Sequence, residues 1–320
     1  MYKEFFHLKA NPFEISPDPD FLYPTARHYE ALASLYYGIR ARKGFVVLTG
    51  EVGTGKTMTV RCLMDKLEKN RVHYAYVFNT RLTPREFLRY LAGDLGLPTN
   101  WKEKSELLLR LHEFLIRRHS QGDTTVLVVD EAHLLRRDVL EEIRLLTNLE
   151  TNRAKLLQIA LVGQPELDEL LDSPNLRQLK QRIALRCQLR PLTWEETQGY
   201  VRWRLKVAGA NGESAIFPRE SLEVIFRYSQ GYPRLINTIG ENTLISAFAA
   251  GTRKIPVGLV EEACCDLRLS PGPSPKSAEA VSGQPGRTEF PAALQELVDV
   301  VETAAEGYVT RTKVIQEGNG

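Results

Sequence analysis

The chain has 320 residues, and its 42 Lys and Arg against 40 Asp and Glu give a formal charge of +2. This near-neutral balance argues against a protein that binds nucleic acid over its whole surface, but it does not exclude a local basic patch. The 4 cysteines form no CxxC pair, which indicates neither a zinc site nor a disulfide framework. The sequence has no apolar run of membrane-spanning length and no signal peptide. We therefore expect a cytoplasmic protein without a transmembrane segment.

The first 28 residues are predicted to form an N-terminal extended segment, because Pro and Asp recur between positions 11 and 24. Its larger apolar side chains, Phe13, Phe21, Leu22 and Tyr23, need a surface to pack against. Two interpretations stay open: these side chains hold the amino terminus against the domain, or they line a pocket beside the motif that follows. Apolar residues at helical spacing predict a helix from His28 to Arg40.

The next motif is a strand, a glycine-rich turn and an amphipathic helix, which is the context required of a phosphate-binding loop. The glycines let backbone N–H groups turn toward one point, and the start of the helix adds its dipole to the same anion site. We expect Lys56 to reach the β- and γ-phosphates and the Thr57 hydroxyl to bind Mg²⁺. The predicted ATP-binding residues are Gly50, Glu51, Val52, Gly53, Thr54, Gly55, Lys56, Thr57 and Met58. The aromatic residues of the N-terminal segment would then be candidates for the adenine pocket.

Two further strands bring polar groups toward the same edge of the predicted sheet. The first covers positions 73–79 and has Asn79 at its carboxyl end. The second is a near-continuous apolar run at 124–129, typical of a strand covered on both faces, and Asp130 and Glu131 follow it. Ligands of open α/β sheets bind at this carboxyl edge. We expect Asp130 to hold Mg²⁺ through water and Glu131 to orient and deprotonate the attacking water.

The fourth strand, at 156–163, delivers Gln164 to the same edge, and a fifth is predicted at 184–189. Helices opening near Thr83, Lys102 and Asp138 alternate with these strands. Five strands alternating with helices predict a three-layer α/β core with a largely parallel sheet over residues 29–192. A basic stretch without acids precedes the end of this core, with Arg177, Lys180, Arg182, Arg186 and Arg190.

After this core the pattern changes to helices alone, which predicts a small all-helical lid over residues 193–268. Thr193 and Glu196 form a capping box at its start. Arg234 lies at a helix start, where the dipole disfavours a cation, so either a nearby anion or simple solvent exposure explains it. A Pro-, Ser- and Gly-rich linker is predicted at 269–291 and a short helical or disordered tail at 292–320.

Together these motifs resemble the AAA+ ATPases over roughly residues 1–268. More narrowly, they are similar to the general-secretion-pathway protein A family of bacterial ATPases, and they also resemble transposition-regulator and, more distantly, origin-recognition ATPases. The strings that carry the resemblance are NPF at 11–13, PDP at 17–19, FLY at 21–23, HYEAL at 28–32, KGF at 43–45, GEVGTGKT at 50–57, DEAH at 130–133 and GQPEL at 163–167.

The resemblance implies a three-layer P-loop NTPase fold with a five-stranded parallel sheet, in which the strand before Gln164 lies between the phosphate-loop strand and the strand before Asp130. It implies that Gln164 is the first nucleotide sensor, near the γ-phosphate. It also implies that Asn79 restrains Glu131 until a partner arrives, and that Arg234 is the second sensor, linking the lid to the γ-phosphate.

Arg182 matches the arginine finger that reaches the ATP of a neighbouring subunit, with Arg177 as the alternative. The resemblance therefore implies a homo-oligomeric, Mg²⁺-dependent ATP hydrolase that drives assembly or secretion-type machinery with an unidentified protein partner. A second hypothesis is an ATP-dependent, DNA-associated regulator of the transposition type, since the basic stretch 177–190 offers phosphate contacts. Alternatively, those arginines serve the subunit interface. A third hypothesis is a partner-binding scaffold that holds ATP without hydrolysing it.

Overall fold

The computed structural model describes residues 2–16, 18–68, 71–210 and 216–273. These residues belong to one compact unit, residues 1–281. The predicted tail 292–320, and the predicted linker beyond residue 273, lie outside the described residues. Within the described ranges, no helix has both the length and the apolar character that a membrane crossing requires.

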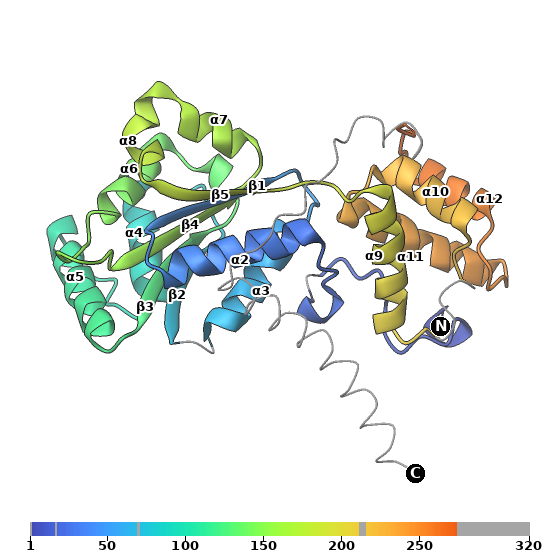
Figure 1. The fold of residues 1–320 in the computed structure, drawn as a ribbon, viewed down its shortest axis with the longest axis horizontal. Coiled ribbons are helices and arrows are strands. Elements are labelled where there is room, and N and C mark those ends of the chain that lie inside the picture. Colours follow the sequence, from blue (N-terminus) through green and yellow to red (C-terminus); the bar gives the residue numbers. More distant parts are fainter. Residues whose placement is uncertain (1, 17, 69–70, 211–215, 274–320) are drawn as a thin grey trace, which may run out of the picture. The chain divides into compact units, whose positions relative to one another are not determined.

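Five strands form one sheet in the order β2-β3-β4-β1-β5, and every neighbouring pair is parallel (Figure 1). This confirms the predicted parallel sheet, including the place of β4 between β1 and β3. All five carboxyl ends therefore share one edge. The strands are β1 (Phe45–Gly50), β2 (Val72–Val77), β3 (Thr124–Val129), β4 (Leu157–Gly163) and β5 (Ile183–Leu189).

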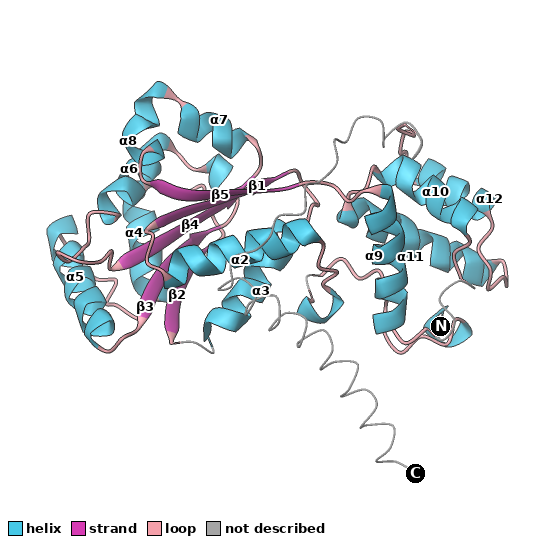
Figure 2. Cartoon of the chain, viewed as in Figure 1, coloured by secondary structure: helices cyan, strands magenta, loops and turns pink. Residues whose placement is uncertain are grey.

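Helices cover both faces of this sheet, which completes the predicted three layers (Figure 2). On one face, alternate strand residues such as Val47 and Leu127 share a buried cluster with α4 (Pro84–Asp94), α5 (Lys104–Ser120), α6 (Arg137–Leu146), α7 (Glu166–Asp172) and α8 (Arg177–Lys180). On the other face lie α2 (Ala26–Arg40) and α3 (Lys56–Glu68). The α2 helix approaches β1 so closely that a Cβ on Gly38 would be 2.4 Å from Val46 Cγ1.

The sequence pattern missed several short elements. These are α1 (Tyr2–Phe5), α7, α8 and three 3₁₀ turns, at Pro19–Phe21, Ala132–Leu134 and Pro174–Leu176. Each is 7 residues or fewer, too short to show a helical period. The strand predicted to reach Asn79 ends at Val77, so Asn79 lies in the loop that follows.

The region after the sheet is helical, with α9 (Trp194–Val207), α10 (Arg219–Ser229), α11 (Pro233–Ala249) and α12 (Val257–Asp266). Its buried cluster also contains residues of the N-terminal segment. Phe13 is fully buried there, edge-to-face against Phe217 with ring centroids 5.9 Å apart. Arg204 of α9 donates hydrogen bonds to the carbonyls of Pro12 and Glu14. The N-terminal segment therefore packs with the helical region.

Gly231, between α10 and α11, packs against Leu192 in the segment that follows β5. The Leu192 N–H donates to the Gly231 carbonyl at 2.8 Å, and Gly231 has a φ of +76°. A Cβ built on Gly231 would lie 2.0 Å from the Leu192 carbonyl oxygen. Only glycine combines this conformation with such a close approach.

We expect Gly231→Ala to lower the free energy of unfolding by on the order of 2–3 kcal/mol, because the new methyl group must displace backbone. Urea unfolding followed by circular dichroism measures this change. Gly258→Ala in α12 is the matched control, because a Cβ there meets no atom within 4 Å. That control should be neutral or stabilising by about 0.5–1 kcal/mol. Equal unfolding midpoints for Gly231→Ala and the parent would contradict the steric argument.

Candidate nucleotide-binding site

The loop between β1 and α3 has a backbone that only glycine adopts readily. Gly53 and Gly55 have φ values of 81° and 98°. A Cβ on Gly50 would lie 2.9 Å from both the Leu189 carbonyl oxygen and Thr54 Oγ1. The 13-residue helix α3 begins directly at Lys56, so its first N–H groups and its dipole face the loop. This backbone fits a bound phosphate group.

Lys56 lies inside this loop with only 6% of its surface exposed. Its Nζ donates to the Gly50 carbonyl at 2.8 Å and to the Glu51 carbonyl at 3.0 Å. An ammonium has three N–H donors, so one remains for a ligand. Burial lowers the pKa of Lys56, and the charges of Glu131 and Asp130 partly offset that effect. A buried ammonium with one remaining donor can bind an anion, which is the role that the sequence analysis assigned to Lys56.

Asp130 is the centre of a second polar cluster beside Lys56. Thr57 Oγ1 donates to Asp130 Oδ2 at 3.2 Å, and the Tyr76 hydroxyl donates to the same oxygen at 2.8 Å. The Glu131 N–H donates to Asp130 Oδ1 at 2.9 Å. Hydroxyl and carboxylate oxygens are the ligands that Mg²⁺ prefers, so the adjacent Thr57 and Asp130 fit the predicted metal site.

Tyr76 is a member of this cluster that the sequence analysis missed. Burial, followed by the charge of Asp130, raises its pKa, so the phenol stays protonated as a donor. Its position one residue before the end of β2 offered a signal, because β2 pairs with β3 and Tyr76 lies opposite Val128, two residues before Asp130.

Glu131 follows Asp130 in a left-handed backbone conformation, with φ 50° and ψ 37°. Its Oε2 lies 3.4 Å from His133 Nδ1, and His133 Nε2 lies 2.9 Å from Gln164 Nε2. Asn79, in contrast, is exposed and accepts a hydrogen bond from the Arg81 N–H at 3.2 Å. No hydrogen bond joins Asn79 to Glu131 in the described part of the chain, so the restraining role of Asn79 stays a prediction.

Arg234 approaches the phosphate-binding loop from the helical region. Its backbone N–H donates to the Gly53 carbonyl at 3.2 Å. A Cβ on Gly53 would lie 2.8 Å from Arg234 Cβ. The side chain is exposed at the N-terminal end of α11. The structure thus brings Arg234 to the loop, where a bound phosphate would compensate the unfavourable helix dipole.

These groups surround a cavity of about 560 Å³, a volume typical of small-molecule sites. Both interpretations of the N-terminal aromatic residues describe part of the structure, since Phe13 packs with the helices while Phe21, Leu22 and Tyr23 line the cavity. The predicted site residues among its lining are Val52, Gly53, Gly55, Lys56, Thr57, Met58, Glu131, Gln164 and Arg234.

His28 contacts the phosphate-binding loop, and the sequence analysis missed this role. Its Nε2 lies 3.2 Å from the Thr54 carbonyl oxygen, and its Nδ1 lies 2.8 Å from Thr25 Oγ1. The imidazole is buried, and burial lowers its pKa below the ordinary 6.5. A histidine at the start of a predicted helix gave no reason to expect this contact.

We expect His28 to make folding stability sensitive to acid. Because the pKa of His28 is lower in the folded state, the unfolded chain binds more protons once the pH falls below about 6.5. Stability should therefore be lost as the pH drops from about 7.5 to 5.5, and His28→Gln should lose less over this interval. Urea unfolding midpoints at the two pH values measure this loss of stability. His112→Gln on α5 is the control and should keep the parent's pH dependence.

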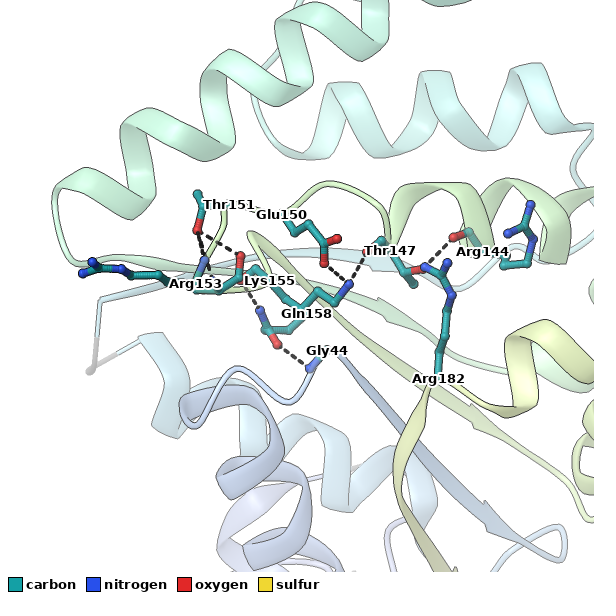
Figure 3. A network of polar contacts seen from close by, with 10 residues as sticks. Gly44, Arg144, Thr147, Glu150, Thr151, Arg153, Lys155, Gln158 and Arg182 are labelled. Atoms are coloured by element: carbon teal, nitrogen blue, oxygen red, sulfur yellow. Dashed lines mark hydrogen bonds and ion pairs between the residues drawn. The ribbon is translucent and has the colours of Figure 1, made fainter.

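Arg182 lies at the opposite end of the sheet from this cavity. It directly precedes β5, whose Ile183 pairs with Phe45 at the start of β1. The 6-residue strand β1 therefore separates Arg182 from the loop by about 20 Å. Figure 3 shows its guanidinium pointing to Thr147, to which it donates a hydrogen bond. Arg182 cannot serve the phosphate site of its own chain in this arrangement.

The basic stretch that contains Arg182 is less free than its sequence suggests. Arg186 pairs with Asp168 and Asp172 at 3.1 Å, and Lys180 pairs with Asp172 at 3.0 Å. The acids come from α7, which the sequence analysis did not predict as a helix. Among the described residues of this stretch, only Arg177 and Arg190 lack a side-chain partner, which reduces the charge available to DNA phosphates.

Comparisons with known proteins find relatives by sequence and by fold. Residues 39–171 match the family described as AAA domain. General secretion pathway protein A of Aeromonas hydrophila is 46% identical over 268 residues, which are 83% of this chain and 48% of that protein. The chain thus spans about half the length of this relative.

Three solved structures share the fold. The ORC2 protein of Aeropyrum pernix in ADPNP–ADP complexes has a TM-score of 0.62 at 17% identity, covering 86% of this chain and 75% of that one. Cdc6p of Pyrobaculum aerophilum has a TM-score of 0.64 at 20% identity, covering 80% of this chain and 70% of that one. Drosophila ORC bound to DNA has a TM-score of 0.63 at 21% identity, covering 86% of this chain and 67% of that one. The chain therefore contains an AAA domain, shares its fold with these structures, and is a relative of General secretion pathway protein A over 268 residues.

Proposed function

We propose that this chain binds ATP together with Mg²⁺ and hydrolyses it. The observation that carries the proposal is that Lys56, Thr57, Glu131, Gln164 and Arg234 all line one cavity. A site that only held the nucleotide would need the loop and Lys56. It would not need a carboxylate on the adjacent strand end with access to the same space.

The chemistry follows from the positions of these side chains. Lys56 and the loop N–H groups would hold the phosphates, and Thr57 and Asp130 would hold Mg²⁺, which neutralises phosphate charge when bound. The Glu131 carboxylate would accept the proton of the attacking water. Gln164 and Arg234 would contact the terminal phosphate from the sheet and from the helical region.

We further propose that the active form is a homo-oligomer. Arg182 is about one strand length from its own phosphate loop, so a role at a phosphate site would be at the site of a second copy. The machinery that hydrolysis drives is proposed from the relative alone, whose name places it in general secretion. An unidentified protein partner would couple ATP hydrolysis to that machinery.

Phosphate release from purified protein with ATP and Mg²⁺, measured over a range of protein concentrations, tests the proposal. We expect turnover that rises more steeply than linearly with concentration, because neighbouring copies complete each site. Lys56→Ala is the control for contaminating ATPases and should abolish turnover. Absence of turnover at every concentration, with ATP binding intact, would refute hydrolysis by this chain on its own.

A further inference from the structure

His133 contacts two side chains of the proposed catalytic site without lining the cavity itself. Its Nδ1 is 3.4 Å from Glu131 Oε2, and its Nε2 is 2.9 Å from Gln164 Nε2. Only 9% of the His133 side chain is exposed, against 43% for Glu131. Glu131 and Gln164 both line the cavity. The imidazole is therefore a buried connection between two groups that face the substrate.

The hydrogen-bonding capacities of the partners place the ring proton on Nδ1. The Gln164 amide nitrogen can only donate, so Nε2 must accept from it and cannot itself carry a proton in the neutral ring. Nδ1–H then faces Glu131 Oε2 at 3.4 Å, a buried oxygen that accepts no hydrogen bond from any described residue. The reverse tautomer, with Nδ1 accepting from the Gln164 backbone N–H at 3.4 Å, would turn a lone pair toward that carboxylate. Leaving a buried carboxylate oxygen unpaired is costly.

We propose that His133 is a positioning residue for ATP hydrolysis, which fixes the Glu131 carboxylate and the Gln164 amide in one joint arrangement. The inference rests on the proposed hydrolysis. It gives Glu131 the partner that Asn79 does not provide in this structure. It also links Glu131, the proposed base, to Gln164, the proposed sensor, so that a change in the position of either side chain would alter the position of the other.

The test compares kcat and KM for ATP in the parent and three variants. His133→Ala should lower kcat by about 10–100-fold and leave KM within about threefold, because misplaced reacting groups slow the chemical step. Among the described residues, the polar contacts of His133 are to Glu131 and Gln164 and not to the phosphate-binding loop, so nucleotide binding should be retained. His133→Asn can restore a donor near Nδ1, and His133→Gln can restore an amide near Nε2. The Asn variant should recover more of kcat, since it keeps the contact to Glu131.

A double-mutant cycle distinguishes positioning from a merely structural role. In a Gln164→Ala background, adding His133→Ala should cost less than it does in the parent, because half of the joint arrangement is already gone. Fully additive losses, or a parental kcat in His133→Ala, would overturn the inference while leaving the proposed function intact.

A second measurement needs no turnover. In ¹⁵N-histidine spectra, the resonance that His133→Asn removes should report the Nδ1–H tautomer. An Nε2–H tautomer would overturn the inference even in an active enzyme. If the Nδ1–H tautomer is present but the parent does not hydrolyse ATP under any condition, the proposed function fails, and the role of His133 in hydrolysis fails with it.

Discussion

Glu131→Gln is expected to lower kcat for ATP by about 10²–10⁴-fold while leaving ATP affinity unchanged, because the amide cannot take a proton from water. The substitution keeps the shape of a side chain that lines the cavity beside Lys56. It leaves untouched the glycine loop and the pair of Thr57 with Asp130 that we assign to binding. Phosphate release and the binding of a fluorescent ATP analogue measure the two effects separately.

Glu220→Gln, an exposed substitution on α10, is the control for this experiment and should match the parent in both measurements. A Glu131→Gln protein that retains kcat within about threefold would show that another group accepts the proton. A protein that loses ATP binding instead would show that Glu131 shapes the phosphate site.

The sheet and the loop could be predicted from the sequence because each is determined by local pattern. β1 and β3 are fully buried and each contains four consecutive apolar residues, at 45–48 and 126–129. Gly53 and Gly55 have a positive φ, and Gly50 has no room for a Cβ. Asp130 follows directly on a strand end, so a parallel sheet places it beside the loop. The strand order was implied by the family resemblance, not by the pattern.

The supporting residues could not be predicted because their contacts are between segments far apart in the chain. His28 reaches Thr54 from the preceding helix, and Tyr76 reaches Asp130 from a neighbouring strand. His133 meets Gln164 only because β3 and β4 are adjacent. The acidic partners of the basic stretch could not be predicted for a similar reason, because they lie on α7, a helix too short to show a period.

Arg182→Ala is expected to lower kcat by about 10³–10⁵-fold at saturating ATP, the effect of removing an arginine finger. The structure explains why this loss would act on a neighbour, because Arg182 lies at the amino ends of the strands and the loop at their carboxyl ends. In the single chain its guanidinium is bonded to Thr147. To act as a finger, Arg182 would exchange Thr147 for the phosphate of a second copy. Arg153→Ala removes an exposed cation from the same edge and should leave the rate unchanged (Figure 3).

Mixing two inactive proteins tests whether Arg182 acts between copies. Lys56→Ala lacks a working phosphate loop but keeps Arg182, and Arg182→Ala keeps the loop. At some junctions between the two proteins, one intact loop faces one intact arginine. Random mixing of a homo-oligomer makes about a quarter of all junctions of this kind. Equal mixtures should therefore regain up to about a quarter of the parental rate. No recovery in mixtures that do co-assemble would place Arg182 outside the neighbour's site. Loss of activity in Arg177→Ala with Arg182→Ala still active would assign the finger to Arg177. That exposed side chain starts α8 and has no side-chain partner to release among the described residues.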